Sequence, residues 1–145
     1  YLTLENLRLN NKFKFQIEVD PMIEPSIAEI PTMIIQPLVE NAIIHGITKK
    51  EGKGNISIKF SGNDQTIICM VEDDGLGMKK DDDRMIDHTY KHQSFGIKGI
   101  NERIEILNRM KQFKIEMFHI DLKDDRDFAT GTSVKIIIHT ILQNP

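Results

Sequence analysis

Five segments of the chain combine apolar residues at strand spacing with boundaries of turn-forming residues. This pattern predicts strands at residues 12–19, 56–60, 66–71, 114–120 and 132–141. The first of them alternates polar and apolar side chains with a period of two, so we expect it to be half-buried. The stretch 61–65, Ser-Gly-Asn-Asp-Gln, joins the second strand to the third and predicts a β-hairpin.

Two other segments carry apolar residues at helical spacing. The first has an apolar stripe that is too broad for a surface helix, so we expect it to be largely buried. Pro31 is placed to start this helix, Pro37 is expected to bend it and Gly46 is placed to end it. The second helix is amphipathic and is expected to end near Met110. Its apolar positions are Ile97, Ile100, Ile104 and Leu107.

The order of these elements predicts the class of fold. A strand, a helix, two strands, a second helix and two strands follow one another, with a polar, poorly periodic loop at residues 78–95. This order favours an α/β sandwich with the helices on one sheet face, and the hairpins argue against an all-parallel sheet. The chain starts with an amphipathic stretch, with Leu4 and Leu7 three apart, which indicates the end of a helix that enters from upstream. We expect one domain at residues 11–145, preceded by the end of that helix at residues 1–10.

Composition excludes several classes of function. A length of 145 residues suits a single domain, and no apolar run approaches the roughly 20 residues of a membrane helix. A net charge of -3 argues against a general nucleic-acid binder, because affinity for the phosphate backbone comes from clustered Lys and Arg. The single cysteine, Cys69, lies in an apolar run, so we expect a buried core thiol rather than a disulfide or a multi-cysteine zinc site.

Three clusters of polar residues stand out against this background. The first lies on the buried helix, where Glu40, Asn41 and His45 project from one edge. A single buried Asn would more simply make a cap or a local hydrogen bond. A carboxylate, an amide oxygen and an imidazole together instead offer oxygen ligands for Mg2+ and a polar partner for phosphate.

The second cluster follows the third strand and consists of Asp73, Asp74, Gly75, Leu76 and Gly77. A carboxylate at the end of a buried strand, beside glycines that let a planar ligand approach, can accept a hydrogen bond from an exocyclic amine such as that of adenine. The alternative is a plain acidic turn. A calcium loop is excluded, because counting back from Gly75 puts Met70 at the first ligand position.

The third cluster begins at the end of the polar loop. Residues 94–104 lead through Gly96 onto a helix N-terminus, whose N–H groups and positive dipole end favour phosphate. The alternative is an ordinary helix start with glycine as the N-cap. Gly131 and Thr132, before the last strand, are a weaker signal. The sequence contains no P-loop, dinucleotide fingerprint, HExxH pair or G-x-S-x-G elbow.

In order, the three clusters resemble the N, G1 and G2 boxes of the GHKL ATPases, which include histidine kinases, type II topoisomerases, Hsp90 and MutL. Residues 36–46 are most similar to the N box of the LytS-like sensor histidine kinases and agree with it at ten of eleven positions. The family usually has Lys or Arg where this chain has Ile44, and its second glycine box often has Gly and Asn at the positions of Ser94 and Gly99. The resemblance implies a Bergerat ATP-binding fold, a two-layer sandwich whose mixed, mostly antiparallel five-stranded sheet is covered on one face by about three helices.

The resemblance also implies roles for the residues of the N box. Asn41 would ligate Mg2+, and Glu40 would help to position groups at the γ-phosphate, so these two residues are the expected catalytic pair. His45 would face the phosphates. The cation that is missing at Ile44 would be supplied by one of four residues, Lys80, Arg84, Lys91 or Lys98.

The glycine boxes would bind the rest of the nucleotide. Asp73 would accept the adenine amino group, while Gly75 and Gly77 would shape the adenine floor. Thr132 would join the water network around the base. Residues 78–95 would form the ATP lid, and the N–H groups that face the phosphates would come from the helix start at Gly96 and Ile97.

The activity implied is phosphoryl transfer from Mg-ATP to a histidine on an upstream phosphoacceptor helical domain, which then feeds a response regulator. The parent protein would be a homodimer through that helical domain, anchored in the inner membrane with this domain in the cytoplasm. This segment would neither insert into the membrane nor bind nucleic acid. None of the five histidines lies in an acceptor setting, so the fragment alone would not phosphorylate itself. The alternatives are an ATPase clamp of the same superfamily and a nucleotide-sensing pseudokinase module.

Overall fold

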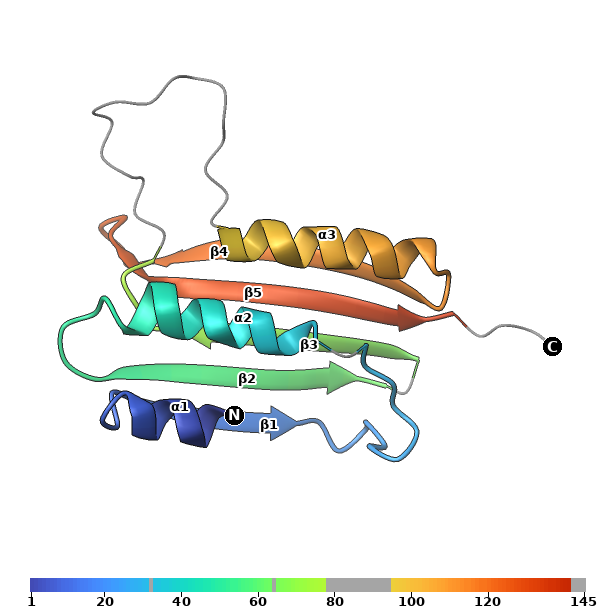
Figure 1. Ribbon diagram of the computed structural model, residues 1–145, viewed down its shortest axis with the longest axis horizontal. Coiled ribbons are helices and arrows are strands. Elements are labelled where there is room, and N and C mark those ends of the chain that lie inside the picture. The colour runs from blue at the N-terminus through green and yellow to red at the C-terminus, as the bar shows by residue number, and fades with distance from the viewer. Residues whose placement is uncertain (32, 64, 78–94, 142–145) are drawn as a thin grey trace, which may run out of the picture.

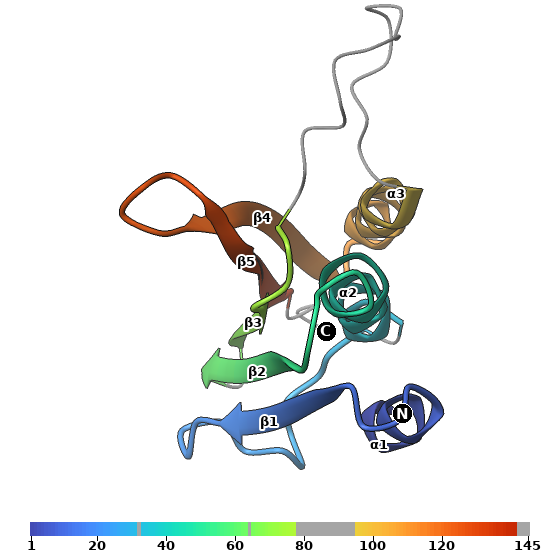
Figure 2. The ribbon, with the colours of Figure 1, turned by 90° about the vertical axis from the view of Figure 1, so that its left-hand side faces the viewer.

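The computed structural model describes residues 1–31, 33–63, 65–77 and 95–141. They form two layers, a twisted sheet and a set of helices on one of its faces (Figures 1 and 2). The strands are β1 (Phe13–Val19), β2 (Gly54–Gly62), β3 (Thr66–Asp73), β4 (Phe113–Lys123) and β5 (Ala129–Thr140). The helical segments are α1 (Leu2–Arg8), α2 (Ile35–Asn41), the π-helix η1 (Ala42–Ile47) and α3 (Phe95–Arg109). Within these ranges, no helix reaches the length and hydropathy that crossing a membrane requires.

The sheet is mixed, as the sequence predicts. Its strands lie in the order β1-β2-β3-β5-β4. β1 runs parallel to β2, whereas the other three neighbouring pairs are antiparallel. The β2–β3 hairpin forms at the predicted turn, and β4 and β5 form a second hairpin. β2, β3 and β4 extend beyond their predicted ranges, whereas β1 begins one residue later than predicted and β5 begins earlier and ends one residue earlier. The predicted two-layer architecture is therefore confirmed.

The core lies between the sheet and the helices. Burial alternates along the whole of β3, because successive side chains of a strand point to opposite faces. Cys69 is completely buried in this strand, as predicted, and burial raises the pKa of its thiol to about 12. The amphipathic pattern of α3 is also confirmed, since Ile100 and Ile104 are both buried against the sheet layer.

The helix that carries the first polar cluster differs from its prediction in three ways. It begins at Ile35 rather than near Pro31, because Met33 has a left-handed backbone (φ 62°) that no helix continues through. Pro37 therefore lies in the first turn rather than in the helix interior, so its missing N–H group costs no hydrogen bond. Gly46 does not end the helix. The chain widens into η1 instead, and Thr48 N donates to Ile43 O at 2.9 Å across five residues.

The expectation of a half-buried first strand was also wrong. Only Phe13 is buried in β1, and the exposed fractions of Ile17 and Val19 are 54% and 50%. β1 is an edge strand, and α1 lies over its beginning (Figure 1). The alternating pattern of β1 thus fixes which side chains share a face, but the neighbouring helix decides which of them are covered.

Candidate functional site

Asp73 is the buried carboxylate at the end of β3. Its side chain is 4% exposed, and its Oδ1 atom accepts a hydrogen bond from Gly75 N at 2.9 Å. Its Oδ2 atom accepts a hydrogen bond from the hydroxyl of Thr132, which lies directly opposite on β5. Burial raises the pKa of Asp73 above its usual value, although the hydrogen bonds from Thr132 and Gly75 act in the opposite direction. The carboxylate is thus held in one orientation inside the sandwich.

Two glycines make room for this carboxylate. A Cβ atom on Gly46 would overlap the carboxylate of Asp73, and a Cβ atom on Gly75 would overlap the backbone of Gly46. The π-helix and the loop after β3 therefore touch backbone to backbone beside Asp73. Glycine at both positions is what allows the two segments to pack this closely around the carboxylate of Asp73. Gly46 was expected only to end a helix, so its part in the site was missed.

Asn41, the last residue of α2, carries an orphaned polar group. Its Nδ2 atom is buried and has no hydrogen-bond partner among the described residues. Leaving a buried donor unpaired costs about 1–3 kcal/mol, so such a group indicates a ligand that supplies an acceptor. A phosphate oxygen is an acceptor of this kind, and the Oδ1 atom of the same amide is an oxygen ligand that suits Mg2+. The residue present thus fits the group that the sequence implies.

The other residues of the N box lie toward solvent. Glu40 accepts a hydrogen bond from Gln36 Nε2 at 2.9 Å, and both side chains are accessible. His45 is exposed, and the exposed fraction of Ile44 is 50%. In the described ranges, no three His, Cys, Asp or Glu side chains are grouped to hold a metal ion. Mg2+ commonly keeps several waters and takes one or two protein ligands plus substrate phosphates.

The second glycine box lies at the same end of the sheet. Figure 1 shows that η1, the end of β3, the start of β5 and the start of α3 all meet at the left-hand end of the molecule. Gly96 and Ile97 fall in the first turn of α3, where backbone N–H groups have no acceptor within the helix. Gly77 follows Asp73 on the loop, with a left-handed backbone (φ 69°) next to Ala129. The predicted lid at 78–95 falls outside the described residues except for its last position.

Asp74 has an environment opposite to that of its neighbour. Its carboxylate accepts hydrogen bonds from Asn55 N at 2.7 Å and Asn55 Nδ2 at 2.6 Å, and it pairs with Lys50 Nζ at 3.0 Å. Burial raises the pKa of Asp74, but the hydrogen bonds from Asn55 and the charge of Lys50 outweigh burial and lower it. Asp74 therefore fastens the loop after β3 to β2 and to the segment after η1. The sequence contains little indication of this structural role, because it shows only that two acidic residues are adjacent.

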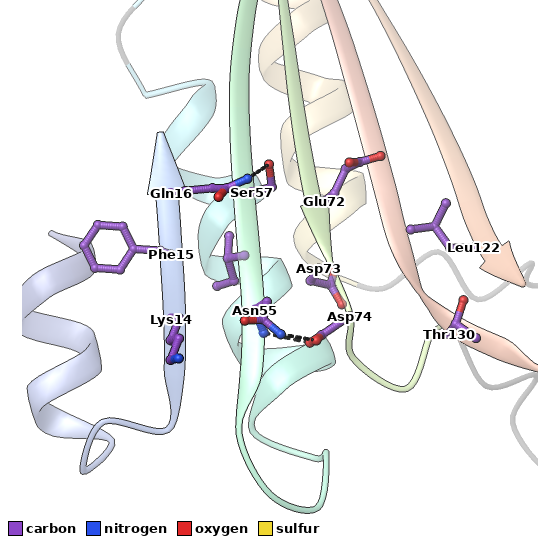
Figure 3. Close-up of a pocket in the computed structure, with 11 residues that line it drawn as sticks. Lys14, Phe15, Gln16, Asn55, Ser57, Glu72, Asp73, Asp74, Leu122 and Thr130 are labelled. Carbon is purple, nitrogen blue, oxygen red and sulfur yellow. Dashed lines mark hydrogen bonds between the residues drawn. The ribbon is translucent and has the colours of Figure 1, made fainter. Parts of the chain in front are cut away.

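An open groove of about 590 Å³ lies on the face of the sheet that the helices leave uncovered, and Asp73 and Asp74 are among the residues that line it. Figure 3 shows Lys14, Gln16, Ser57 and Glu72 along this groove, with the helices behind the strands. Its lining mixes both signs of charge, and Gln16 Nε2 lies 3.5 Å from Ser57 Oγ. The predicted N-box residues do not line it. Asp73 borders both this groove and the helix layer, and the contact between its carboxylate and Gly46 places the candidate site, the cradle around Asp73, on the helix side of the sheet.

The cradle can be compared with known proteins. Residues 28–140 match the family model described as histidine kinase-, DNA gyrase B- and HSP90-like ATPase. The chain belongs to this family. The resemblance to GHKL ATPases that the three boxes indicate is thereby confirmed, and it covers the elements from α2 to β5.

Within this ATPase family, the chain is similar to sensor histidine kinases. It is 29% identical over 111 residues to the sensor histidine kinase YpdA of Escherichia coli (strain K12), covering 74% of this chain and 19% of YpdA. It is 33% identical over 81 residues to the sensor protein LytS of Bacillus subtilis (strain 168), covering 56% of this chain and 13% of LytS. YwpD of the same strain is 34% identical over 142 residues, which are 96% of this chain and 46% of YwpD. The chain thus spans less than half the length of these relatives.

Solved structures agree with the fold. The catalytic domain of histidine kinase ThkA matches with a TM-score of 0.60 at 14% identity, over 97% of this chain and 88% of that chain. The mycobacterial sensor histidine kinase MprB matches with a TM-score of 0.57 at 12% identity, over 96% of this chain and 91% of that chain. At such identities the likeness shows the fold alone. The chain is a GHKL ATPase domain of the type found in sensor histidine kinases.

Proposed function

We propose that this domain binds Mg-ATP and donates the γ-phosphate to a histidine on an upstream helical domain of the same sensor kinase. The observation that carries the proposal is the buried carboxylate of Asp73, oriented by Thr132 and Gly75 in a cradle of two glycines. A carboxylate in this setting is suited to accept the amino group of adenine. The orphaned amide of Asn41 supports a phosphate or metal partner on the adjoining helix.

The chemistry follows from positioning rather than from a covalent step on this domain. Bound Mg2+ would neutralise charge on the β- and γ-phosphates. Asn41 would hold the metal, Glu40 would orient the acceptor side, and the N–H groups of Gly96 and Ile97 would bind phosphate oxygens. The imidazole nitrogen of the acceptor would form a bond to the γ-phosphorus in line with the bond that breaks, and ADP would leave with the bonding electron pair.

The proposed partners follow from the greater length of the relatives and from the fact that two of them, YpdA and LytS, are sensor proteins. We propose an upstream phosphoacceptor helical domain, a homodimer formed through it and a response regulator that receives the phosphoryl group. The parent protein would be anchored in the inner membrane, with this domain on the cytoplasmic side. In that arrangement the segment 1–10, which includes the observed helix α1, is the end of the phosphoacceptor domain, and residues 11–145 are the catalytic domain.

A second candidate rests on Ile44. Its side chain is 50% exposed at a position where the resembling kinases carry a cation, so one phosphate contact is absent from η1. A domain of this kind would bind nucleotide weakly and signal by binding alone. Radiolabel from [γ-32P]ATP that reaches the upstream domain of the parent kinase would contradict this candidate. Steady release of phosphate without a labelled histidine would indicate an ATPase clamp instead.

Calorimetric titration tests the adenine assignment directly. We expect Mg-ATP to bind the wild-type domain, and Asp73→Asn to weaken binding about 10- to 100-fold, as for the loss of a hydrogen bond to a charged group. Glu72→Gln is the matched control, because Glu72 adjoins Asp73 but points to the opposite face of the sheet. Equal affinities of wild type and Asp73→Asn would remove Asp73 from the site.

A further inference from the structure

Lys50 lies just after the π-helix η1, and its side chain contacts the loop after β3. Its Nζ atom donates a hydrogen bond to Asp74 O at 2.8 Å and lies 3.0 Å from Asp74 Oδ1. Its backbone is also fixed, because Lys50 O accepts a hydrogen bond from Lys12 Nζ at 2.7 Å and Lys50 N donates to Ile47 O at 3.1 Å. The Lys50 side chain is 26% exposed, so salt screens this ion pair less than it screens a fully exposed one.

Asp74, the partner of Lys50, is also bound by Asn55 of β2. Asn55 donates two hydrogen bonds to the Asp74 carboxylate (Figure 3), and Asp74 N donates to Asn55 O at 3.2 Å. The N–H group, the carbonyl oxygen and the carboxylate of Asp74 therefore all have partners, and these partners come from two segments outside its own loop. The conformation of Asp74 is thus set by the contacts of Lys50 and Asn55.

The conformation of Asp74 in turn determines where the carboxylate of Asp73 points. Asp73 Oδ1 accepts a hydrogen bond from Gly75 N, and Asp74 lies between this donor and this acceptor in the chain. A turn of this kind forms only when the backbone of the middle residue adopts a suitable conformation. Gly75 also meets Gly46 of η1 backbone to backbone, and among the described residues no backbone hydrogen bond joins these two glycines. The ion pair of Lys50 and Asp74 supplies a polar link between the same two segments.

We propose that Lys50 is a positioning residue for Asp73 and that, through Asp74, it sets how strongly the site distinguishes adenine from purines without the amino group. This inference rests on the function proposed above, in which Asp73 accepts the amino group of adenine. Without the Lys50 charge, the loop after β3 keeps its hydrogen bonds with Asn55 but loses its link to the segment after η1. The Asp73 carboxylate then samples orientations that accept the amino group less well. Asn41, on the proposed phosphate side, lies on α2 and keeps its contribution.

Base selectivity tests this role, because a residue that only stabilises the fold would not change it. The probes are ATP and purine riboside triphosphate, which has the same sugar and phosphates but lacks the amino group. Each is titrated calorimetrically into the chain in the presence of Mg2+. We expect Lys50→Met to reduce the ratio of the two association constants about 3- to 10-fold, as for the loss of a partly exposed, charge-assisted contact. Affinity for the analogue should change by less than about twofold, because the analogue makes no hydrogen bond to the Asp73 carboxylate.

Three further variants serve as controls, with circular dichroism as the check on folding. Lys49→Met removes the same charge from the exposed neighbouring residue and should leave the ratio unchanged. Lys50→Arg keeps the charge and the donors and should retain most of the wild-type ratio. Asp74→Asn removes the charge of the other partner, so we expect it to lower the ratio and to leave Lys50→Met with little further effect. If Lys50→Met does not fold, Asp74→Asn alone measures the contribution of the ion pair.

The outcomes separate this inference from the proposed function. A wild-type chain that prefers ATP, with the same ratio in Lys50→Met, would overturn the role of Lys50 and leave the assignment of Asp73 standing. Equal losses of affinity for both nucleotides would also overturn it, since they indicate a general loss of structure rather than a misdirected carboxylate. A wild-type chain that binds both nucleotides equally would overturn the assignment of Asp73 and the role of Lys50 with it. A wild-type chain that binds neither would overturn both proposals.

Discussion

Thr132 donates a hydrogen bond to Asp73 across the β3–β5 pair, and the two residues lie directly opposite each other in the strand register. The sheet itself therefore orients the carboxylate, since neither residue belongs to a loop. The same register places Ile56 of β2 on the other side of Asp73. The carboxylate that we propose to bind adenine is thus part of the hydrogen-bonded ladder, where its position is as well defined as that of a core side chain.

Burial of this carboxylate gives a prediction about stability and pH. The pKa of Asp73 is raised in the folded state, so the folded protein holds this proton more tightly than the unfolded chain. The stability contributed by the protonated form is fully present below the unfolded pKa near 3.9 and is lost as pH rises through the folded value. We expect Asp73→Asn to be more stable than wild type at pH 7, on the order of 1 kcal/mol, with the difference vanishing at low pH. Urea unfolding between pH 3 and pH 7 measures it, and a constant difference across this range would contradict the prediction.

The contact between Gly46 and Asp73 predicts a steric effect. A methyl group at Gly46 would overlap the carboxylate, so we expect Gly46→Ala to cost about 1–3 kcal/mol of stability and to abolish detectable nucleotide binding. Gly99→Ala is the control, because a Cβ atom at Gly99 meets nothing within 4 Å and α3 should gain about 0.4–1 kcal/mol. Thermal unfolding and calorimetry on the two variants measure both quantities. A Gly46→Ala variant that binds like wild type would place the ligand away from η1.

Asn41→Leu separates stability from binding. The substitution removes a buried donor that has no partner among the described residues, so we expect the ligand-free domain to become more stable by about 1 kcal/mol. Binding of Mg-ATP should fall at least tenfold, because the amide can no longer contact metal or phosphate. Chemical denaturation without nucleotide, followed by titration with Mg-ATP, tests the two halves independently. Loss of both stability and binding would show that Asn41 is a structural residue.

Ile44→Lys restores a cation at the N box. The side chain is 50% exposed, so a lysine can reach solvent without disturbing the core. We expect affinity for ATP to rise about 3- to 10-fold at low salt and the gain to shrink as ionic strength rises. Ile106→Lys, at a side chain 57% exposed on α3, adds the same charge and is the control. Equal gains in both variants would mean that net charge, rather than a local phosphate contact, is responsible.

Periodicity alone predicted most of the elements. β3 and β5 have apolar runs bounded by turn residues, and α3 repeats apolar residues at three and four, so their patterns leave little choice of structure. These patterns could not predict that Asp73 lies opposite Thr132. The register between β3 and β5, which are not consecutive in the chain, depends on the β2–β3 and β4–β5 hairpins. The family resemblance did assign both residues to one site, but it implied that Thr132 contacts water around the base rather than the carboxylate of Asp73.

Other features could not be predicted because they depend on contacts distant in sequence. Gly46 has the local chemistry of a helix end, but the space it leaves is needed by Asp73 from another element. The exposure of Ile17 depends on how far α1 extends over β1, and the alternation of the strand contains no such information. The late helix start follows from the left-handed backbone of Met33, which is an unusual conformation for that residue type.

The wider turn of the π-helix η1 determines how Asn41 and Gly46 are oriented relative to each other around the helix axis. Asn41 and Gly46 are five residues apart, and in an α-helix of 3.6 residues per turn they would point about 140° away from each other. In a π-helix, whose hydrogen bonds span five residues, each residue rotates the chain through a smaller angle than in an α-helix. Positions five apart therefore lie closer to one face. The number of residues in this turn therefore matters as much as their identity. An α-helical turn with the same number of residues between Asn41 and Gly46 would rotate Gly46 away from Asp73 and disrupt the cradle.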